Sequence, residues 1–296
     1  MNTTKTLILV DWSNTMYRSW FSSVDKTWVA YARFFDMLRA CVHKVKQPNV
    51  PIELIFCGES RVPLERKKID PAYKSNRVPN KNEEFRQYRQ GLCDLLQRLN
   101  WALISYPGYE ADDCIASIVA TTCHRCYCKT KCTNCHCADG YTTDIVIFSG
   151  DRDLQQLLAW DRVTIWREGK RFDRQWFEKE YDIPVADFPI WKALWGDTSD
   201  NIKGVTGFGP VKARIAINAG SVEEDIWEIA GQQGMEDYIK ALQLIELNIN
   251  LPIRPADFRQ FSKNGYGPIS MAELDELSDI DERILLEIKR LLEEMK

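Results

Sequence analysis

The chain has 296 residues, of which 45% are hydrophobic and 28% charged, a composition that excludes disordered, fibrous and low-complexity proteins. Its 39 basic and 43 acidic residues give a net charge of −4, which argues against a uniformly basic nucleic-acid binder. No apolar run approaches the roughly 18 residues of a membrane span, and the N-terminus lacks a secretory signal, so we expect a cytoplasmic protein without membrane contacts.

Short β-rich runs alternate with helix-length amphipathic stretches over the first two thirds of the chain. This alternation predicts an α/β fold with a mostly parallel central sheet and helices on both faces. The expected strands are TLILV, IELIFC, WALISY, DIVIF and VTIW. The expected helices cover residues 14–46 with a break near Asp25, 82–99, 111–121 and 154–160.

Beyond Ile183 the pattern is mostly helical and contains no strand-like run. We therefore predict two domains, an α/β core over residues 1–184 and a helical region over residues 185–296. The C-terminal stretch has apolar residues at helical spacing with acidic flanks, and we interpret it as a plain solvated helix.

Basic residues concentrate between Arg61 and Arg89, where nine of them stand among four acidic residues. The segment carries a local charge of +5 while the rest of the chain carries −9, which suggests one phosphate-binding and one cation-binding region. Three aromatic residues interleave with the basic ones and are predicted to stack on nucleobases. They are Tyr73, Phe85 and Tyr88. For Lys67, Lys68 and Lys81 an ordinary solvated helical face is an equal alternative.

An acidic residue follows the carboxyl end of four predicted strands. The four are Asp11, Glu59, Glu110 and Asp151, and three more carboxylates adjoin them, Asp112, Asp113 and Asp153. Because ligands of open α/β sheets bind outside these strand ends, we expect the carboxylates to converge. A role in helix capping alone would not require so many of them. Their hard oxygen ligands suit two Mg²⁺ or Mn²⁺ ions, the usual arrangement for phosphodiester hydrolysis.

Five collinear motifs over residues 7–219 resemble those of the 5' nuclease superfamily, which includes flap endonucleases, phage 5'-3' exonucleases and the 5' nuclease domain of bacterial DNA polymerase I. The motifs are VDWSN, YKSNR, EADD, SGDRDLQQL and GDTSDNIKGVTGFGPVKA. The resemblance implies a PIN-like metallonuclease core, a helical arch at about residues 60–90 and a helix-hairpin-helix module that grips duplex DNA.

The resemblance also implies roles for individual residues. The first metal would lie among Asp11, Glu59, Glu110 and Asp112, with Asp113 close by, and the second among Asp151, Asp153, Asp197 and Asp200. The family usually has aspartate where this chain has Glu59. In the arch, Lys74 and Arg77 would contact the scissile phosphate and Arg66 would assist.

Three glycines within six residues, Gly204, Gly207 and Gly209, permit tight turns and backbone contacts with phosphate. Their position before a helix predicts a helix-hairpin-helix with Lys203 and Lys212 as phosphate contacts. The resemblance adds that such a loop can hold K⁺.

Six of the ten cysteines lie within residues 123–137. Cys123, Cys126, Cys132 and Cys135 form two CxxC pairs, which predict a structural zinc site, although a cluster of reduced thiols is the alternative. Four further residues, Cys128, Cys137, His124 and His136, leave the ligand set open to a second zinc or an iron-sulfur cluster.

These features predict a monomeric Mg²⁺-dependent 5'-3' exonuclease of DNA replication and repair that also cuts flaps. Its partners would be DNA 5' ends, flaps and nicks. The alternatives are removal of RNA primers from RNA-DNA hybrids, and a non-catalytic module that binds branched DNA.

Overall fold

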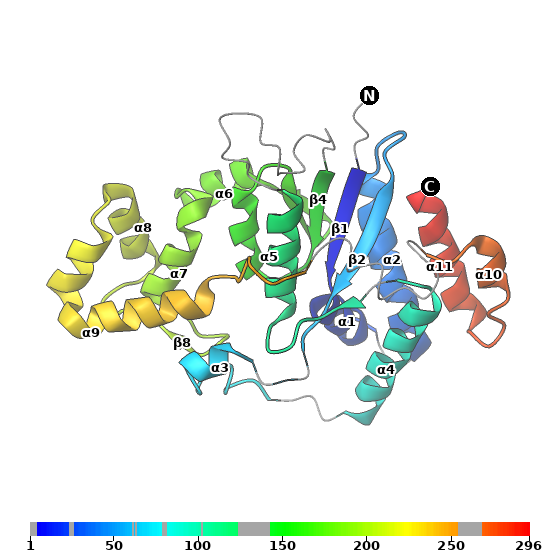
Figure 1. The fold of residues 1–296 in the computed structure, drawn as a ribbon, viewed down its shortest axis with the longest axis horizontal. Coiled ribbons are helices and arrows are strands. Elements are labelled where there is room, and N and C mark those ends of the chain that lie inside the picture. The colour runs from blue at the N-terminus through cyan, green and yellow to red at the C-terminus, as the bar shows by residue number, and fades with distance from the viewer. Residues whose placement is uncertain are drawn as a thin grey trace.

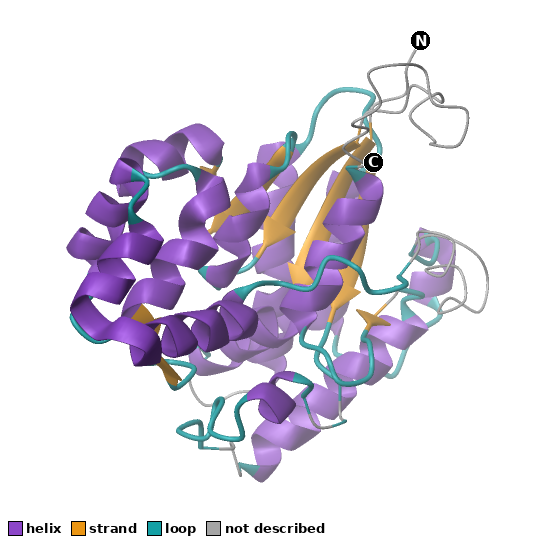
Figure 2. Ribbon diagram, turned by 60° about the vertical axis from the view of Figure 1, so that its left-hand side comes forward, coloured by secondary structure: helices purple, strands orange, loops and turns teal. Residues whose placement is uncertain are grey.

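The computed structural model describes residues 5–23, 27–60, 62, 64–78, 82–101, 103–123, 143–253 and 268–296. In this part of the chain, six strands form one sheet in the order β3-β2-β1-β4-β5-β6, with helices on both faces (Figure 1 and Figure 2). All neighbouring strands are parallel except β5 and β6. The predicted fold class is therefore confirmed. The strands are β1 (Lys5–Asp11), β2 (Ile52–Cys57), β3 (Leu103–Ile104), β4 (Thr143–Phe148), β5 (Val163–Arg167) and β6 (Lys170–Phe172).

The central strand β1 is buried on both faces, which explains why its sequence is a continuous apolar run. Ile8 and Val10 join the hydrophobic cluster on one side of the sheet, and Leu7 and Leu9 join the cluster on the other side. The two clusters form the core. Because β1, β2 and β4 run parallel in register, their carboxyl ends lie at one edge, on the lower side of Figure 1.

Helices on the two faces come from different parts of the chain. On one face the hydrophobic cluster contains side chains from α1, α2 and α4, and on the other it contains side chains from α5, the 3-10 helix η2 and α6. The break expected near Asp25 separates α1 from α2, and the helix expected at 154–160 is η2. The bounds are α1 (Trp12–Phe21), α2 (Thr27–Val45), α3 (Arg66–Ile69), α4 (Glu83–Arg98), α5 (Ala111–Thr122), η2 (Asp153–Ala159) and α6 (Arg174–Tyr181).

Two strand predictions need correction. The WALISY strand shrinks to β3, whose C-terminal limit follows from the end of β2 at Cys57, opposite Ile104. The antiparallel strand β6 was not predicted at all. It forms a hairpin with β5 through Glu168 and Gly169, both at positive φ, so the Glu-Gly pair was the available turn signal.

The region after Ile183 is mostly helical, and α7, α8 and α9 lie together at one end of the molecule (Figure 1). The prediction that it contains no strand is wrong, because β7 and β8 form a small antiparallel pair. Two-residue strands leave no alternating pattern that a sequence could show. The bounds are η3 (Val185–Asp187), α7 (Phe188–Trp195), β7 (Gly196–Asp197), β8 (Ile202–Lys203), α8 (Pro210–Ala219) and α9 (Val222–Ile245).

The C-terminal helices α10 (Met271–Asp275) and α11 (Glu282–Met295) lie at the opposite end, beside α2 (Figure 1). The apolar stripe of α11 is buried in the core cluster that contains α2, through Ile284, Ile288, Leu291 and Leu292. The expected solvated helix is therefore wrong, because the stripe covers a face of α2 that would otherwise be exposed. Among the described residues, no helix is both long and apolar enough to cross a membrane.

Candidate active site

Asp11 ends β1 and caps the N-terminus of α1. Ser149, at the end of the neighbouring β4, donates its hydroxyl to Asp11 Oδ2 at 2.7 Å, and the Asn14 N–H donates to Oδ1 at 3.0 Å. Burial raises the pKa of Asp11 to about 6, because these two hydrogen bonds do not offset the loss of water and the nearby charges of Asp151 and Glu59. Within the described part of the chain, this buried carboxylate at the centre of the edge forms no ion pair.

The carboxylates predicted from the strand ends do converge. A cavity of about 210 Å³ is lined by acidic residues from four separate segments, together with Lys74, Arg77 and Tyr17. The acidic residues are Asp11, Glu59, Glu110, Asp112 and Asp151. Burial, reinforced by the charges of Asp151 and Asp11, raises the pKa of Asp112 well above its ordinary value. We call this space the first cavity.

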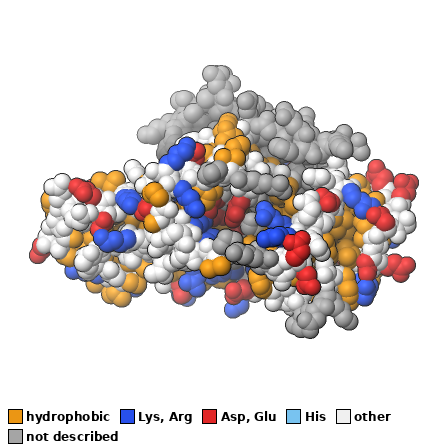
Figure 3. All heavy atoms as spheres, turned by 90° about the horizontal axis from the view of Figure 1, so that it is seen from below, with side chains coloured by type: hydrophobic (Ala, Val, Ile, Leu, Met, Phe, Trp, Pro, Cys, Tyr) orange, Lys and Arg blue, Asp and Glu red, His pale blue; other side chains and the backbone are white. Residues whose placement is uncertain are grey.

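A second cavity of about 500 Å³ adjoins the first and shares Asn14, Arg77 and Asp151 with it. Its acidic wall consists of Asp151, Asp153, Asp197 and Asp200. Figure 3 shows acidic side chains inside a hollow near the middle of this face, with lysine and arginine side chains on both sides of it. The two signs of charge that the sequence separates therefore meet at one place in the fold.

Lys192 is a site residue that the sequence interpretation missed. It lies on α7 with only 5% of its surface exposed, and its ammonium group contacts Asp153 and lies 2.6 Å from Asp197 Oδ2. Burial alone would lower the pKa of Lys192, but the charges of the two carboxylates and the hydrogen bonds to them raise it. At Asp153, burial raises the pKa of the carboxyl to about 6, because its effect is larger than the lowering effect of the Lys192 charge. A single lysine inside the apolar helix FPIWKALW was the available signal.

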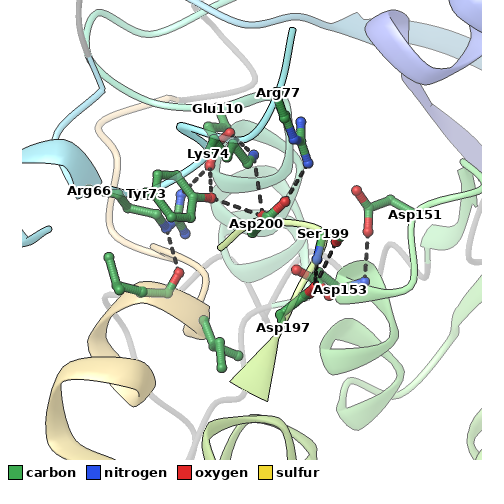
Figure 4. A network of polar contacts seen from close by, with 12 residues as sticks. Arg66, Tyr73, Lys74, Arg77, Glu110, Asp151, Asp153, Asp197, Ser199 and Asp200 are labelled. Carbon is green, nitrogen blue, oxygen red and sulfur yellow. Dashed lines mark hydrogen bonds and ion pairs between the residues drawn. The ribbon is translucent and has the colours of Figure 1, made fainter. Parts of the chain in front are cut away.

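A network around Glu110 joins the predicted arch to the carboxylates (Figure 4). Tyr73 donates its hydroxyl to Glu110 Oε2 at 2.7 Å and to Asp200 Oδ2 at 3.2 Å. The Lys74 ammonium contacts Glu110 and lies 3.5 Å from Asp200 Oδ2. Arg77 contacts Asp200 as well. Although burial opposes it, the charges of Lys74 and Arg66 lower the pKa of Glu110.

Arg66 and Asp113 form a buried ion pair, which corrects two of the expected roles. Arg66 Nη1 and Nη2 donate to the two oxygens of Asp113 at 2.6 and 2.8 Å, and Arg66 Nε donates to the carbonyl of Leu244 at 2.8 Å. Asp113 also accepts the N–H of Asn248 at 2.9 Å. Because these oxygens are occupied and Asp113 is fully buried, its geometry does not fit a metal ligand. Arg66 ties α3 to α5 and to the end of α9 and is not directed at a phosphate.

The prediction that Tyr73, Phe85 and Tyr88 stack on nucleobases is wrong, because all three rings are buried. Tyr73, Phe85 and Tyr88 are at most 3% exposed, so none presents a ring face to a nucleobase. Two aromatic residues of α1 are exposed instead, Tyr17 by 40% and Phe21 by 68%, with rings stacked at 6.0 Å. Tyr17 also lines the first cavity. The helical period of α1 turns these rings outward. Phe85 and Tyr88 point inward because α4 packs on the core, and Tyr73 is buried in a separate cluster with Leu244 and Ile245.

The donor set can be tested for its fit to divalent cations. Within the described residues, no three histidine, cysteine or acidic side chains already form a metal-binding group. Lysine and arginine side chains lie between the carboxylates instead, at Lys74, Arg77 and Lys192. Burial and the charges of neighbouring carboxylates nevertheless raise the pKa values of Asp11 and Asp112, and the charge of Lys74 opposes the shift at Asp112 only in part. The oxygen-only chemistry of these carboxylates fits hard cations such as Mg²⁺ or Mn²⁺.

The glycine segment leads from β8 into α8, as expected for its place in the chain. Gly204 is required by packing, since a Cβ there would lie 2.4 Å from the backbone of Trp195. Gly207 has a φ of 89° and packs beside Ile229, and Gly209 caps α8. Lys203 is mostly exposed and lies 2.6 Å from Asp237 Oδ2. The exposed Lys212 lies over the ring of Phe208.

The cysteine insert falls largely outside the described residues. Cys126, Cys132 and Cys135 lie there, as do Cys128, Cys137 and both histidines. Cys123 is described at the end of α5, where its thiol donates to the carbonyl of Asp161 at 3.8 Å. Burial raises the pKa of Cys123 to about 11.

Comparisons with known proteins find a matching family and several relatives. The family of the 5'-3' exonuclease, N-terminal resolvase-like domain, matches residues 6–182. A 5'-3' exonuclease of Aquifex aeolicus is 28% identical over 84% of the chain and 84% of its own length. A thermostable DNA polymerase I of Thermus thermophilus is 26% identical over 83% of the chain, which spans only 29% of that protein.

The fold has a solved counterpart in the bacteriophage T5 D15 flap endonuclease, crystallised as a complex with DNA and metal ions. The alignment covers 98% of this chain and 99% of that one, with a TM-score of 0.60 and 19% identity. At that identity the likeness concerns the fold.

Proposed function

The chain belongs to the family of the 5'-3' exonuclease, N-terminal resolvase-like domain, and from this premise we propose that it is a Mg²⁺-dependent 5' nuclease of DNA. It would hydrolyse phosphodiesters from 5' ends and cut 5' flaps. The observation that carries the proposal is the pair of adjoining cavities, where carboxylates from four strand ends meet Lys74 and Arg77. The T5 flap endonuclease, crystallised with DNA and metal ions, supports both kinds of ligand.

Two groups of carboxylates would hold the ions. Asp11, Glu59, Asp112 and Asp151 surround the first cavity, with Glu110 beside them, and Asp151, Asp153, Asp197 and Asp200 surround the second. Bound ions of this type polarise a phosphoryl oxygen and lower the pKa of bound water. Asp113 is left out of the set, because Arg66 occupies it. Glu59 is exposed and carries one more methylene than the aspartate usual in the family.

The basic side chains would bind and orient the phosphate. Arg77 lies at the shared wall of the cavities and Lys74 lines the first cavity. Both could exchange their carboxylate partners, Asp200 and Glu110, for a non-bridging phosphate oxygen. Donors placed where charge develops stabilise the transition state more than the ground state. Lys192 offsets part of the negative charge of Asp153 and Asp197 and so weakens the repulsion between the two carboxylates.

Duplex DNA would be gripped by the segment from Lys203 to Lys212, through backbone amides near the glycines and through the two lysines. This assigns a helix-hairpin-helix function to the residues between β8 and α8, with K⁺ held by backbone carbonyls. The exposed basic residues of the segment from Arg61 to Arg89 would guide the single strand.

The insert is proposed to hold a structural zinc at Cys123, Cys126, Cys132 and Cys135. Elemental analysis of the purified protein should give close to one zinc per chain, or two if further thiols take part. Replacing Cys123 and Cys126 by serine should lower stability more than turnover, because a structural zinc contributes to folding. Absence of both zinc and iron would leave only reduced thiols.

One assay tests the function. Flap, nicked, blunt and RNA-DNA substrates, labelled at the 5' or the 3' end, are incubated with Mg²⁺ or with EDTA. We expect Mg²⁺-dependent release of short 5'-labelled products from flap and nicked DNA. Preferential cleavage of the RNA-DNA hybrid would favour primer removal, and binding without cleavage would favour a branched-DNA binding module. Undiminished cleavage in EDTA would refute the metal-dependent mechanism.

A further inference from the structure

Two segments beside the cavities are held together by asparagine side chains. Each segment contributes one asparagine, whose amide donates to the backbone of the other segment. One segment runs over residues 70–77, and the other is the turn over residues 198–201 between β7 and β8. Asn201 Nδ2 donates to the carbonyl of Ala72 at 2.8 Å and to Ser75 Oγ at 3.1 Å. Asn76 Nδ2 donates to the carbonyl of Thr198 at 2.8 Å. We call this pair the asparagine clamp.

Both sides of the clamp contain a residue in the left-handed backbone region. Lys74 has a φ of 55° and Asn201 a φ of 57°. Asparagine tolerates this conformation, but a lysine adopts it only where the surrounding structure enforces it. The Lys74 N–H donates to the carbonyl of Asp200 at 2.8 Å, between the two amide contacts. The contacts of the clamp therefore lie on both sides of the strained residue and, together with this backbone hydrogen bond, constrain it.

The left-handed turn at Lys74 has a consequence for the site. Its side chain lies in the first cavity, where the ammonium contacts Glu110 and is 3.5 Å from Asp200 Oδ2. The opposite segment carries Asp200, and Asp197 directly precedes it. The clamp thus fixes the cationic side chain relative to the carboxylates of the second cavity.

We propose that Asn76 and Asn201 are positioning residues, which hold Lys74 in its left-handed conformation over the carboxylates before DNA binds. The proposal rests on the nuclease function only for its effect on rate. Both asparagines are exposed, and hydrogen bonds in contact with water contribute little to the free energy of unfolding. We therefore expect the two amides to affect the overall stability of the fold only slightly. Their removal should leave a folded protein.

The kinetic test compares Asn201→Gly and Asn76→Ala with wild type. Glycine at position 201 removes the amide and keeps the left-handed backbone accessible, so a loss reports on the side chain. We expect the single-turnover rate on flap DNA to fall about tenfold, with the DNA Kd changed less than about twofold, since orientation of a catalytic group affects chemistry more than binding. Asn218→Ala is the matched control, because Asn218 makes a similar exposed contact with the carbonyl of Asp182 and should cut normally.

A double-mutant cycle tests whether the clamp acts through Lys74. In a Lys74→Ala background, Asn201→Gly should change the rate less than about twofold, because the group that it positions is already absent. An equal loss in both backgrounds would overturn the proposal, as would an Asn201→Gly rate equal to that of wild type.

Limited trypsin digestion of the DNA-free protein gives a second readout that does not depend on activity. Cleavage after Lys74 and Arg77, identified by mass spectrometry, should accelerate severalfold in Asn201→Gly and Asn76→Ala and stay unchanged in Asn218→Ala. If the wild-type protein cuts no DNA, the proposed function fails, yet this digestion still decides on the clamp. Unchanged cleavage at these two bonds would contradict it.

Discussion

At the scale of single residues, the site is organised by cations that stand among carboxylates. Lys192 lies between Asp153 and Asp197, and Lys74 lies between Glu110 and Asp200. Each is largely buried, so its charge acts in surroundings of low polarity. Burial raises the pKa values of Asp11, Asp112 and Asp153, and at Asp112 and Asp153 it does so against the opposing charges of Lys74 and Lys192. Although burial opposes them, the cations lower the pKa values of Glu110 and Asp197, but at Asp112 and Asp153 they offset the effect of burial only in part.

Replacing Lys192 by methionine should destabilise the metal-free protein. The substitution keeps the length of the side chain but leaves Asp153 and Asp197 without their cation, and loss of one partner of a buried ion pair costs about 3–5 kcal/mol. Urea unfolding in EDTA should show a fall of that order, and millimolar Mg²⁺ should restore part of it. Equal unfolding free energies for wild type and variant in EDTA would contradict the role given to Lys192.

Replacing Asp112 by asparagine should stabilise the metal-free protein at neutral pH. A carboxyl whose pKa is raised on folding weakens the fold above that pKa, and the effect vanishes below the unfolded value of about 4. The gain of the variant should therefore be largest at pH 7 and disappear as the pH falls to about 4. Urea unfolding at several pH values in EDTA checks this. A gain independent of pH would point to packing instead of charge.

At the scale of elements, short segments bring the site together and long ones support it. The two-residue strands β7 and β8 place Asp197 and Asp200, and the single turn of α3 places Arg66. Arg66 then links α3 to Asp113 on α5 and to the carbonyls of Leu244 and Glu246 at the end of α9. The longer helices α2, α4 and α11 pack together in one hydrophobic cluster, on one face of the sheet. The carboxylates come from other segments.

The buried stripe of α11 should contribute strongly to stability. Ile288 is fully buried against the cluster that contains α2, so Ile288→Ala should lower the unfolding free energy by about 2–5 kcal/mol. Leu286 on the same helix is 46% exposed, and Leu286→Ala should cost far less. Thermal and urea unfolding of the two variants measure the difference. Similar small losses in both would favour the solvated helix expected from the sequence.

At the scale of the whole molecule, the fold brings the basic segment of the sequence next to the carboxylates. The overall charge of −4 hides this arrangement, because the basic side chains lie on the rim of a hollow that contains the acidic ones (Figure 3). Binding of DNA to the rim and chemistry in the hollow should therefore respond to different substitutions.

This separation predicts that Asp153→Asn abolishes cleavage but not binding. The substitution removes one ligand of the second carboxylate group and also removes a negative charge that repels DNA. Single-turnover cleavage of flap DNA should fall by orders of magnitude, while the Kd from gel-shift titration stays equal or decreases, with the usual weakening by salt. Lys74→Ala should cut slowly and bind nearly normally, since several other cations remain. Much weaker binding by Asp153→Asn would refute this division.

The sequence by itself determined the layers of the fold and the location of the chemistry. The apolar run of β1 indicates a strand buried on both faces, and parallel strands bring their carboxyl ends to one edge whatever the details of packing. Asp11, Glu59, Glu110, Asp112, Asp151 and Asp153 could therefore be predicted to converge without any coordinates, and they line the two adjoining cavities.

Only the tertiary structure decided which of these groups are free to act. Asp113 follows Asp112 directly, yet its oxygens are occupied by Arg66 from a segment 47 residues away. Tyr73, Phe85 and Tyr88 are aromatic residues in a basic segment, yet contacts with Glu110 and with the helical core bury them. The C-terminal helix is amphipathic, yet its partner α2 lies at the other end of the sequence. Local patterns carry no information on such long-range contacts, because the partner is chosen by packing in three dimensions.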